Sequence, residues 1–301
     1  MFDIAQILTD AYKLRIAHVK KRKLEAWRLY DKEDFDLPLG IDIYKNNAVI
    51  FLFAPIDEST QEEVERFLSE NLHIHKFFYK NKQGGMKSSV EEKKTPLNTE
   101  MITISEYGND FLINLTDYMD TGLFLDHRET RHWIGEKSRG KVVLNTFAYT
   151  GSFSVYAAKA GATKTYSVDL SKTYCDWIKK NIELNHLPLD KNWVYKMETF
   201  EFFKYAQRKE LRFDIIIIDP PTFSRHQGKN FSVERDHPLL INAALELLNP
   251  GGFILFSNNK RGFKIKKNEL TPCHIQNFKN QTWPIDFTDP ETHHCFLIEA
   301  M

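Results

Sequence analysis

Two aspartates directly follow predicted strands, which is where parallel sheets carry catalytic and ligand-binding residues. Asp169 directly follows the β-like run 165–168, and Asp219 directly follows four consecutive isoleucines. In open α/β sheets, ligands bind just beyond the carboxyl ends of the strands. A carboxylate there can accept hydrogen bonds from ribose hydroxyls or face a group that gains positive charge. The two residues therefore indicate a ligand site at one edge of a sheet.

The stretch before Asp169 has the layout of a nucleotide site. Residues 142–151 join a short apolar run to a polar and aromatic turn that ends at Gly151. A helix-like pattern follows over residues 152–160, and then comes the run that ends at Asp169. Strand, glycine turn, helix, strand and acid form the pattern of a doubly wound nucleotide-binding fold.

The turn carries a single glycine, and this restricts the ligand. A dinucleotide site requires Gly-x-Gly-x-x-Gly so that the backbone can approach pyrophosphate, and a phosphate-cradling loop of the Gly-x-x-x-x-Gly-Lys-Ser/Thr type is also absent. S-adenosylmethionine is a nucleoside without phosphate and needs less exposed backbone. The alternative at this level is a βαβ unit that binds no ligand.

The segment around Asp219 predicts the mouth of the site. Four isoleucines, residues 215–218, suit a strand that is buried on both faces of a parallel sheet. Pro220 and Pro221 cannot continue that strand, so the chain must leave the sheet there. The alternative is a rigid exit turn that Asp219 caps.

The composition is that of an ordinary globular protein. A chain of 301 residues is long enough for two domains, and its formal net charge of zero gives no overall field that favours nucleic acid. Three cysteines without metal-type spacing predict a reducing, cytoplasmic environment and no metal site. We see neither a signal peptide nor a membrane-spanning run, and we expect no membrane partner.

Residues 1–116 predict a small α+β domain that could contact RNA. We expect helices over residues 4–29 and 57–71, a hairpin over 40–53, a strand over 72–79, a mobile loop over 80–95 and a second hairpin over 101–115. The first helix is basic in its second half. This indicates either a solvated helix face or a stripe that contacts phosphates, together with the loop over 80–94.

Residues 117–301 predict a Rossmann-like α/β domain with a seven-stranded, mostly parallel sheet and an antiparallel edge. We expect further helices over residues 172–185, 200–209 and 239–248, and further strands over 193–197, 253–257, 274–278 and 295–298. The segment 117–128 mixes aromatic and ionisable residues. Asp126 either caps the following helix, or the segment closes over the ligand, with Phe124 covering it and Asp126 or Arg128 meeting its charged end.

Several of these stretches resemble the class I S-adenosylmethionine-dependent methyltransferases. More narrowly, the chain is similar to the guanine-N7 methyltransferase half of the bifunctional bacterial 23S ribosomal RNA enzymes. The matching stretches are residues 115–118, 121–128, 149–152, 169–174, 218–224 and 256–263. The resemblance covers most of the chain and weakens before Leu115. The second methyltransferase and the RNA-capturing domain of those enzymes have no counterpart here, and Glu198 stands where the family has aspartate.

The resemblance implies S-adenosylmethionine as cofactor and ribosomal RNA as partner, and it leaves the oligomeric state open. The cofactor contacts that we expect are Phe124, Asp126, Arg128, Asn145, Phe147, Tyr149, Thr150, Gly151, Asp169, Leu170, Glu198 and Asp219. By this resemblance the turn lines the methionine side, Asp169 holds the ribose and Glu198 holds the adenine amino group. The catalytic group is Asp219, Pro220, Pro221 and Phe223.

Guanine N7 carries a lone pair and no proton, so its methylation requires no general base. The product is cationic, and Asp219 or a nearby carbonyl would stabilise it. The target base must leave its stack to reach the cofactor. Phe223 is a candidate stacking platform, and the alternative is that it packs against the turn.

Three other functions compete with this one. Cytosine-C5 methylation needs a cysteine near the strand ends, where this chain has Thr222, Asn258 and Asn259. Amino-group methylation usually places an aromatic residue directly after the two prolines, and here Thr222 intervenes. A non-catalytic RNA-binding factor with a methyltransferase fold would need neither Asp169 nor Asp219.

Overall fold

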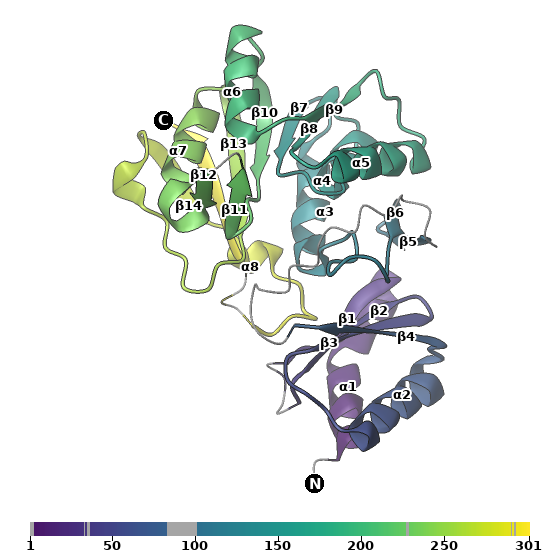
Figure 1. The fold of residues 1–301 in the computed structure, drawn as a ribbon. Coiled ribbons are helices and arrows are strands. Elements are labelled where there is room, and N and C mark those ends of the chain that lie inside the picture. The colour runs from purple at the N-terminus through teal and green to yellow at the C-terminus, as the bar shows by residue number, and fades with distance from the viewer. Residues whose placement is uncertain are drawn as a thin grey trace. The chain divides into compact units, whose positions relative to one another are not determined.

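The chain forms two compact units in the computed structural model, which describes residues 3–32, 34, 37–82, 101–226, 229–289, 291 and 293–301. The first unit is Met1–Asp126 with Pro284–Asp289, and the second is His127–Trp283 with Pro290–Met301. We expected the domain boundary after residue 116, which is ten residues before the observed boundary after Asp126. Each unit is built on a sheet of its own (Figure 1).

The first unit is a four-stranded sheet with two helices packed against it (Figure 1). Its elements are α1 (Ile4–Arg22), β1 (Ala26–Tyr30), β2 (Leu39–Tyr44), β3 (Asn47–Leu52), α2 (Glu58–Leu72) and β4 (Lys76–Asn81), followed by β5 (Ile102–Glu106) and β6 (Asn109–Ile113). The spatial order is β1-β2-β3-β4; the first three strands are antiparallel and β4 is parallel to β3. Strands β5 and β6 form a separate hairpin. This α+β arrangement agrees with the sequence prediction.

The first helix is shorter than the sequence predicts. We expected it to run to residue 29, but α1 ends at Arg22 and the following residues form β1. Lys23 takes a left-handed conformation with φ of 53°, and its N–H bonds back to carbonyls of the last turn. The two predicted hairpins and the helix that Asp57 caps are confirmed. Most of the loop expected over 80–95 lies outside the described residues.

Part of the predicted basic stripe is internal to the first unit. Arg15 is 1% exposed, and its Nη2 lies 2.7 and 2.8 Å from the two carboxylate oxygens of Asp34. Arg28 donates to Asp42 at 2.7 Å. The cations that remain exposed are Lys13 in the middle of the helix and residues 20–23 at its end. Arg15 and Arg28 are therefore engaged inside the unit, and an RNA contact by the exposed cations stays a prediction.

The second unit is a seven-stranded sheet in the spatial order β14-β15-β13-β10-β7-β8-β9. Strands β13, β10, β7, β8 and β9 are parallel, and β15 is antiparallel to both β13 and β14. The strands are β7 (Val142–Thr146), β8 (Lys164–Asp169), β9 (Asn192–Lys196), β10 (Phe213–Ile218), β13 (Leu248–Asn258), β14 (Cys273–Asn277) and β15 (His294–Ala300). The predicted α/β fold, with its mostly parallel sheet and antiparallel edge, is confirmed.

Helices cover both faces of this sheet (Figure 1). One layer holds α3 (Arg128–Lys137), α4 (Ser152–Lys159), α5 (Lys172–Leu184) and α8 (Lys279–Thr282), and the other holds α6 (Thr199–Arg208) and α7 (Val233–Leu245). Short 3-10 turns are η1 (Leu125–His127) and η2 (Lys267–Glu269). The isoleucines of β10 are at most 1% exposed and alternate between the two core layers, as a doubly covered strand requires. None of the helices described has the length and apolar character of a membrane span.

The region between β10 and β13 differs from the sequence prediction. Helix α7 begins at Val233 rather than at residue 239, although a proline within a helix, here Pro238, favours a later start. A hairpin that we did not predict fills the interval, formed by β11 (Phe223–His226) and β12 (Lys229–Ser232). The Asn-Pro-Gly-Gly stretch belongs to β13, where it causes a register shift against β10.

Candidate functional site

The turn between β7 and α4 contains three residues in the left-handed backbone region. Phe147, Tyr149 and Gly151 have φ values of 53°, 52° and 79°. Glycine adopts this region readily, whereas a residue with a side chain pays about 1–3 kcal/mol for it. Such conformations persist only where the surroundings enforce them, and they cluster at functional sites. The amino-acid types at positions 147 and 149 do not indicate that these two aromatic residues are left-handed.

Strand β8 holds the turn from one side. The Ala148 N–H donates to the carbonyl of Val168 at 3.0 Å, and the Tyr149 N–H donates to Oδ2 of Asp169 at 2.9 Å. Two consecutive backbone donors are therefore fixed by the end of the neighbouring strand. This explains how the left-handed conformation of Tyr149 is enforced.

Helix α5 holds the turn from the other side. The Nδ2 of Asn181 donates to the Thr150 carbonyl at 2.9 Å, and the Thr150 side chain is fully buried. A Cβ added at Gly151 would lie 2.8 Å from Cγ2 of Ile178. Only glycine therefore satisfies both the backbone conformation and the close approach of the helix. The Tyr149 ring packs edge-on against Tyr174, with centroids 4.7 Å apart.

Asp169 joins the turn to β8 and still keeps acceptor capacity. Its Oδ2 accepts from Tyr149, and its Oδ1 accepts from the Ser171 N–H at 2.8 Å. A carboxylate can accept about four hydrogen bonds, so acceptor capacity remains for a ribose hydroxyl beside these backbone donors. Burial raises the pKa of Asp169 above its ordinary value, and the backbone N–H bonds oppose that rise. Leu170 beside it is 41% exposed.

Asn145 lies inside the sheet layer. It is 2% exposed, and its Nδ2 donates to the Ser154 hydroxyl at 3.0 Å. Ser167 of β8 bonds to the same hydroxyl at 2.7 Å. These three side chains join β7, β8 and α4 in one buried hydrogen-bond chain beneath the turn.

Glu198 caps helix α6 at the carboxyl end of β9. Its Oε2 accepts from the Glu201 N–H at 3.1 Å. One carboxylate oxygen is therefore occupied by capping. We expect the other oxygen, Oε1, to contact the adenine amino group. That contact stays a prediction.

Asp169 and Asp219 stand on either side of β7 at the same level of the sheet. In the strand register, Thr146 lies opposite Val168 of β8 and opposite Ile218 of β10. Each aspartate is one residue beyond its aligned partner. The structure thus brings the two carboxylates to the same edge of the sheet.

Asp219 is flanked on both carboxylate oxygens by residues that the sequence analysis did not single out. The Ser257 hydroxyl donates to Oδ1 at 2.7 Å, and Nε2 of His127 lies 3.5 Å from Oδ2. The His127 ring packs on that of His293, with centroids 5.0 Å apart. Register could have indicated Ser257, because the preceding residue, Phe256, aligns with the last residue of β10. His127 had no signal beyond its place in the resembling stretch 121–128.

The two prolines lead from the sheet edge into the hairpin. Pro220 is buried and Pro221 is exposed. The Thr222 hydroxyl donates to Oδ1 of Asn259 at 2.9 Å, which ties this exit to the end of β13. Phe223 begins β11 and is 59% exposed, so the alternative in which it packs against the turn is not supported.

The three residues that we expect to close over the cofactor belong to different units. Phe124 and Asp126 belong to the first unit, and Arg128 begins α3 in the second. Phe124 is 38% exposed, whereas Arg128 is fully buried. The N-cap position of α3 is His127 rather than Asp126, so the capping role considered for Asp126 is wrong. Contact of these three residues with the cofactor stays a prediction.

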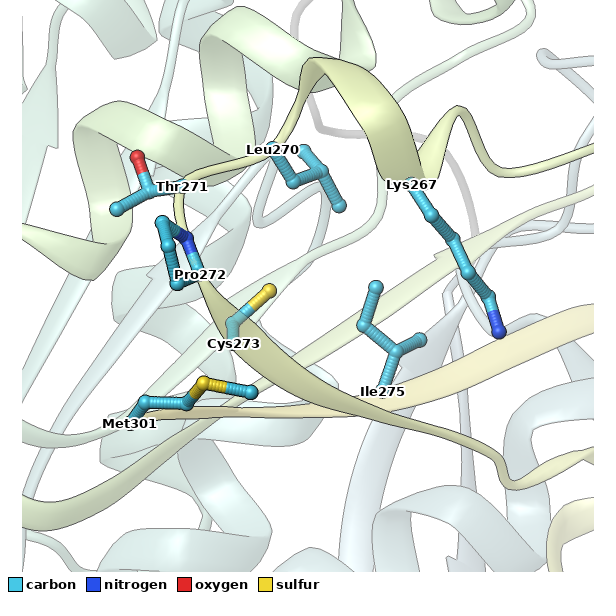
Figure 2. A pocket seen from close by; sticks show the side chains of 7 residues that line it. All are labelled: Lys267, Leu270, Thr271, Pro272, Cys273, Ile275 and Met301. Atoms are coloured by element: carbon cyan, nitrogen blue, oxygen red, sulfur yellow. The ribbon is translucent and has the colours of Figure 1, made fainter.

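A cavity of about 200 Å³ lies elsewhere on the second unit (Figure 2). It is lined by Lys267, Leu270, Thr271, Pro272, Cys273, Ile275 and Met301. In the register, Cys273 pairs with Ala300, and Glu299, the residue before Ala300, pairs with Phe253, five residues before the end of β13. The cavity is therefore remote from the carboxyl edge that carries Asp169 and Asp219, and we assign it no role in the site.

Comparison with known proteins agrees with this geometry. Residues 84–266 match the family model of the S-adenosylmethionine-dependent methyltransferases. The chain is 36% identical over 289 residues to ribosomal RNA large subunit methyltransferase K of Neisseria meningitidis, a match that covers 93% of this chain and 82% of that protein. It is 40% identical over 293 residues to the K/L enzyme of Shewanella pealeana, but it spans only 41% of that relative's length.

Solved structures show the same relationship. A methyltransferase crystallised with SAH superimposes with a TM-score of 0.83 at 27% identity, covering 99% of this chain and 81% of that chain. An S-adenosylmethionine-dependent methyltransferase from Streptococcus mutans gives a TM-score of 0.79 at 26% identity, covering 100% and 82%. From the family model, the relatives and the shared fold, this chain belongs to the family of S-adenosylmethionine-dependent methyltransferases.

Proposed function

We propose that this methyltransferase acts on large-subunit ribosomal RNA and transfers the methyl group to N7 of a guanine. The family gives the reaction class and the cofactor, and the names of the relatives suggest the RNA. The observation that carries the proposal is the position of Asp169 and Asp219 on either side of β7. One carboxylate suits a ribose and the other suits a target that becomes positively charged.

The residues of the turn fit S-adenosylmethionine. Asp169 keeps acceptor capacity for a ribose hydroxyl beside its backbone donors. Phe147, Tyr149 and Gly151 would line the methionine side, and Glu198 would meet the adenine amino group. When bound, the cofactor supplies an electrophilic methyl group.

Methylation at N7 requires alignment more than proton transfer. The nitrogen offers a lone pair in the plane of the base, so no side chain has to remove a proton. Correct positioning alone can contribute about 7–11 kcal/mol in favourable cases. The base becomes cationic as the bond forms, and the Asp219 carboxylate can stabilise that charge. The Ser257 hydroxyl holds the carboxylate in place.

The cysteines argue against cytosine-C5 chemistry, which needs a thiolate. Cys295 pairs with Ser257 across the strands, yet it is fully buried, and burial raises its pKa to about 12. Cys175 lies on α5, and burial raises its pKa to about 11. Cys273 lines the remote cavity. At neutral pH neither buried thiol would ionise.

The exit turn argues against amino-group methylation. Thr222 stands directly after the two prolines, and its hydroxyl is bonded to Asn259. The first aromatic side chain, Phe223, belongs to the hairpin instead. The position at which amino-group methyltransferases usually carry an aromatic residue is therefore taken by a short polar side chain.

Mass spectrometry of ribosomal RNA nucleosides from a deletion strain tests the proposal. We expect 7-methylguanosine to be lost and to return with the wild-type gene but not with Asp219→Ala. Loss of 5-methylcytosine or of an amino-methylated base would overturn the N7 assignment. Unchanged nucleosides would overturn the RNA substrate.

Calorimetry distinguishes the enzyme from a non-catalytic RNA-binding factor. We expect wild-type protein to bind S-adenosylmethionine in the micromolar range, and Asp169→Ala to abolish this binding without unfolding the protein. No heat with the wild type would support the non-catalytic factor.

A further inference from the structure

The hairpin that follows Asp219 has two faces with different partners. Its register pairs Phe223 with Ser232 and Ser224 with Phe231. Neighbouring positions on a strand point to opposite faces, so Phe223 and Arg225 share one face and Phe231 lies on the other. The Phe231 ring packs against Phe147 of the cofactor turn, with centroids 6.0 Å apart. Phe223 and Arg225 are both exposed on the outer face.

Arg235 at the start of α7 braces this hairpin. Its guanidinium donates to the Asn230 carbonyl on β12, and it also bonds both carboxylate oxygens of Asp236. Asp236 in turn accepts from the Ser232 N–H at 2.8 Å. The outer face is thus supported from the helix side as well as by the ring contact of Phe231.

A basic segment emerges beside the hairpin at the end of β13. Residues 259–267 contain five lysines and arginines and no acid. The bond between Thr222 and Asn259 joins this segment to the residue just before β11. Lys260 bonds to Glu234 at 3.1 Å at the start of α7. The segment and the hairpin are therefore neighbours at the same edge of the sheet.

The basic segment is anchored by its backbone and by one aromatic residue. Phe263 is 5% exposed, and its ring packs 4.9 Å from that of His237. The Lys266 N–H donates to Nε2 of His237 at 3.0 Å. With these anchors in the core, Arg261 and Lys264 are exposed on either side of Phe263. Cations held on an ordered backbone lose less freedom when they bind a phosphate than cations on a loose chain.

We propose that the outer face of the hairpin and the basic segment 259–267 form a docking surface for single-stranded RNA. The proposal rests on the proposed function, because the surface borders the site that would receive the target base. Arg225, Arg261 and Lys264 would contact phosphates next to the target nucleotide, and a base would stack on Phe223. Arginine and lysine with an exposed aromatic residue is the combination that binds unpaired strands.

Equilibrium binding to a fluorescent single-stranded RNA of about 20 nucleotides tests the surface directly. The test variant is Arg225→Ala with Lys264→Ala, and the matched control is Arg208→Ala with Lys209→Ala. The control removes the same two charges from exposed positions at the end of α6, just before β10 begins, which is the opposite edge of the sheet. Melting curves confirm that both variants are folded.

We expect the test variant to bind the RNA at least tenfold more weakly and the control to bind like the wild type. The slope of log affinity against log salt should fall by about 1.4, since each phosphate contact on a single strand contributes about 0.7. Phe223→Leu should weaken binding with little change in that slope, because stacking releases no counterions. Cofactor affinity should be the same in the wild type, the test variant and the control.

Equal weakening by test and control variants, or wild-type affinity in the test variant, would overturn the docking surface. Tighter binding of a duplex of the same sequence would also overturn it. Methyl transfer to ribosomal RNA from the deletion strain is measured in parallel. If the wild type transfers no methyl group but the test variant still loses binding, the proposed function fails and the docking surface stands.

Discussion

At the scale of single residues, Asp169 has two tasks, because the carboxylate that holds the Tyr149 N–H is also the group expected to receive a ribose. Burial raises its pKa, so protonation begins at a higher pH than for an ordinary aspartate. A protonated carboxyl group loses one acceptor oxygen. Cofactor affinity should therefore fall as the pH drops through the raised pKa, by about tenfold per pH unit below it.

Calorimetric titration of S-adenosylmethionine between pH 4 and pH 7.5 measures this effect. Asp169→Asn is the control, and we expect it to bind weakly with no such dependence on pH. A wild-type affinity that stays constant down to about pH 4, near the ordinary aspartate pKa, would contradict the prediction.

His127 should matter through Asp219. Its Nε2 faces one carboxylate oxygen, while the Ser257 hydroxyl binds the other. The 3.5 Å approach can tighten into a hydrogen bond as the reaction proceeds, and losing such a bond to a charged group costs about 1.5–3 kcal/mol, or roughly tenfold or more in rate. We expect His127→Leu to lower kcat by that factor and to leave cofactor affinity unchanged.

His127→Gln is the matched variant for this measurement, since its amide can still donate to Asp219, and it should recover part of the lost rate. Ser257→Ala removes the other contact. If kcat in His127→Leu equals that of the wild type, His127 does not position Asp219.

At the scale of elements, the cofactor turn depends on both its backbone conformation and its packing against α5. Gly151→Ala should lower the free energy of unfolding for two reasons. The left-handed backbone, with φ of 79°, costs a residue with a side chain about 1–2 kcal/mol, and the overlap of the new Cβ with Ile178 costs about 1–3 kcal/mol. Gly140→Ala is the matched control, because φ there is 73° and nothing lies within 4 Å of the added Cβ. Urea unfolding should show the larger loss for Gly151→Ala.

A double variant separates the two causes. In Gly151→Ala with Ile178→Ala the overlap is removed, so the loss of stability should be smaller than the sum of the single variants. If the losses are strictly additive, the close approach of α5 is not what requires a glycine at this position.

The sequence predicted the elements of the site better than the contacts between them. The apolar run, the glycine turn and the acid after the next strand were enough to locate the turn and Asp169. They carried no information on the left-handed conformations of Phe147 and Tyr149, which β8 and α5 enforce. The hairpin of β11 and β12 was missed because its strands are short and mostly polar, and such strands lack the apolar alternation that signals a strand.

At the scale of the whole molecule, the sheet of the second unit was predictable because its strands alternate with helices along the chain. The four isoleucines of β10 and the glycine turn predicted the parallel core of the sheet. The two weak strand patterns near the end of the sequence predicted its antiparallel edge. The membership of residues 284–289 in the first unit was not predictable. It depends on contacts between residues more than 250 positions apart, such as the Arg28 N–H with the Asp286 carboxylate at 2.9 Å.

The mechanism predicts that no cysteine is needed for turnover. A variant with Cys175→Ala, Cys273→Ser and Cys295→Ala should transfer methyl groups at close to the wild-type rate. It should melt at a lower temperature, because two of the three side chains fill buried space. Loss of turnover in a variant that is still folded would revive a thiolate mechanism.

The segment Pro284–Asp289 has a consequence for how the protein is made. The first unit uses Asp286 to accept from the Arg15 guanidinium and the Arg28 backbone, and the Thr288 N–H to bond Asp31. A ribosome releases the amino-terminal residues first, and Asp286 follows Arg28 by 258 residues, so these partners emerge long after the residues that they contact. At about 5–20 residues per second, the delay is on the order of tens of seconds. During that interval Arg15 and Arg28 lack these late-arriving partners, and the nascent first unit cannot complete its contacts until residues 284–289 have been synthesised.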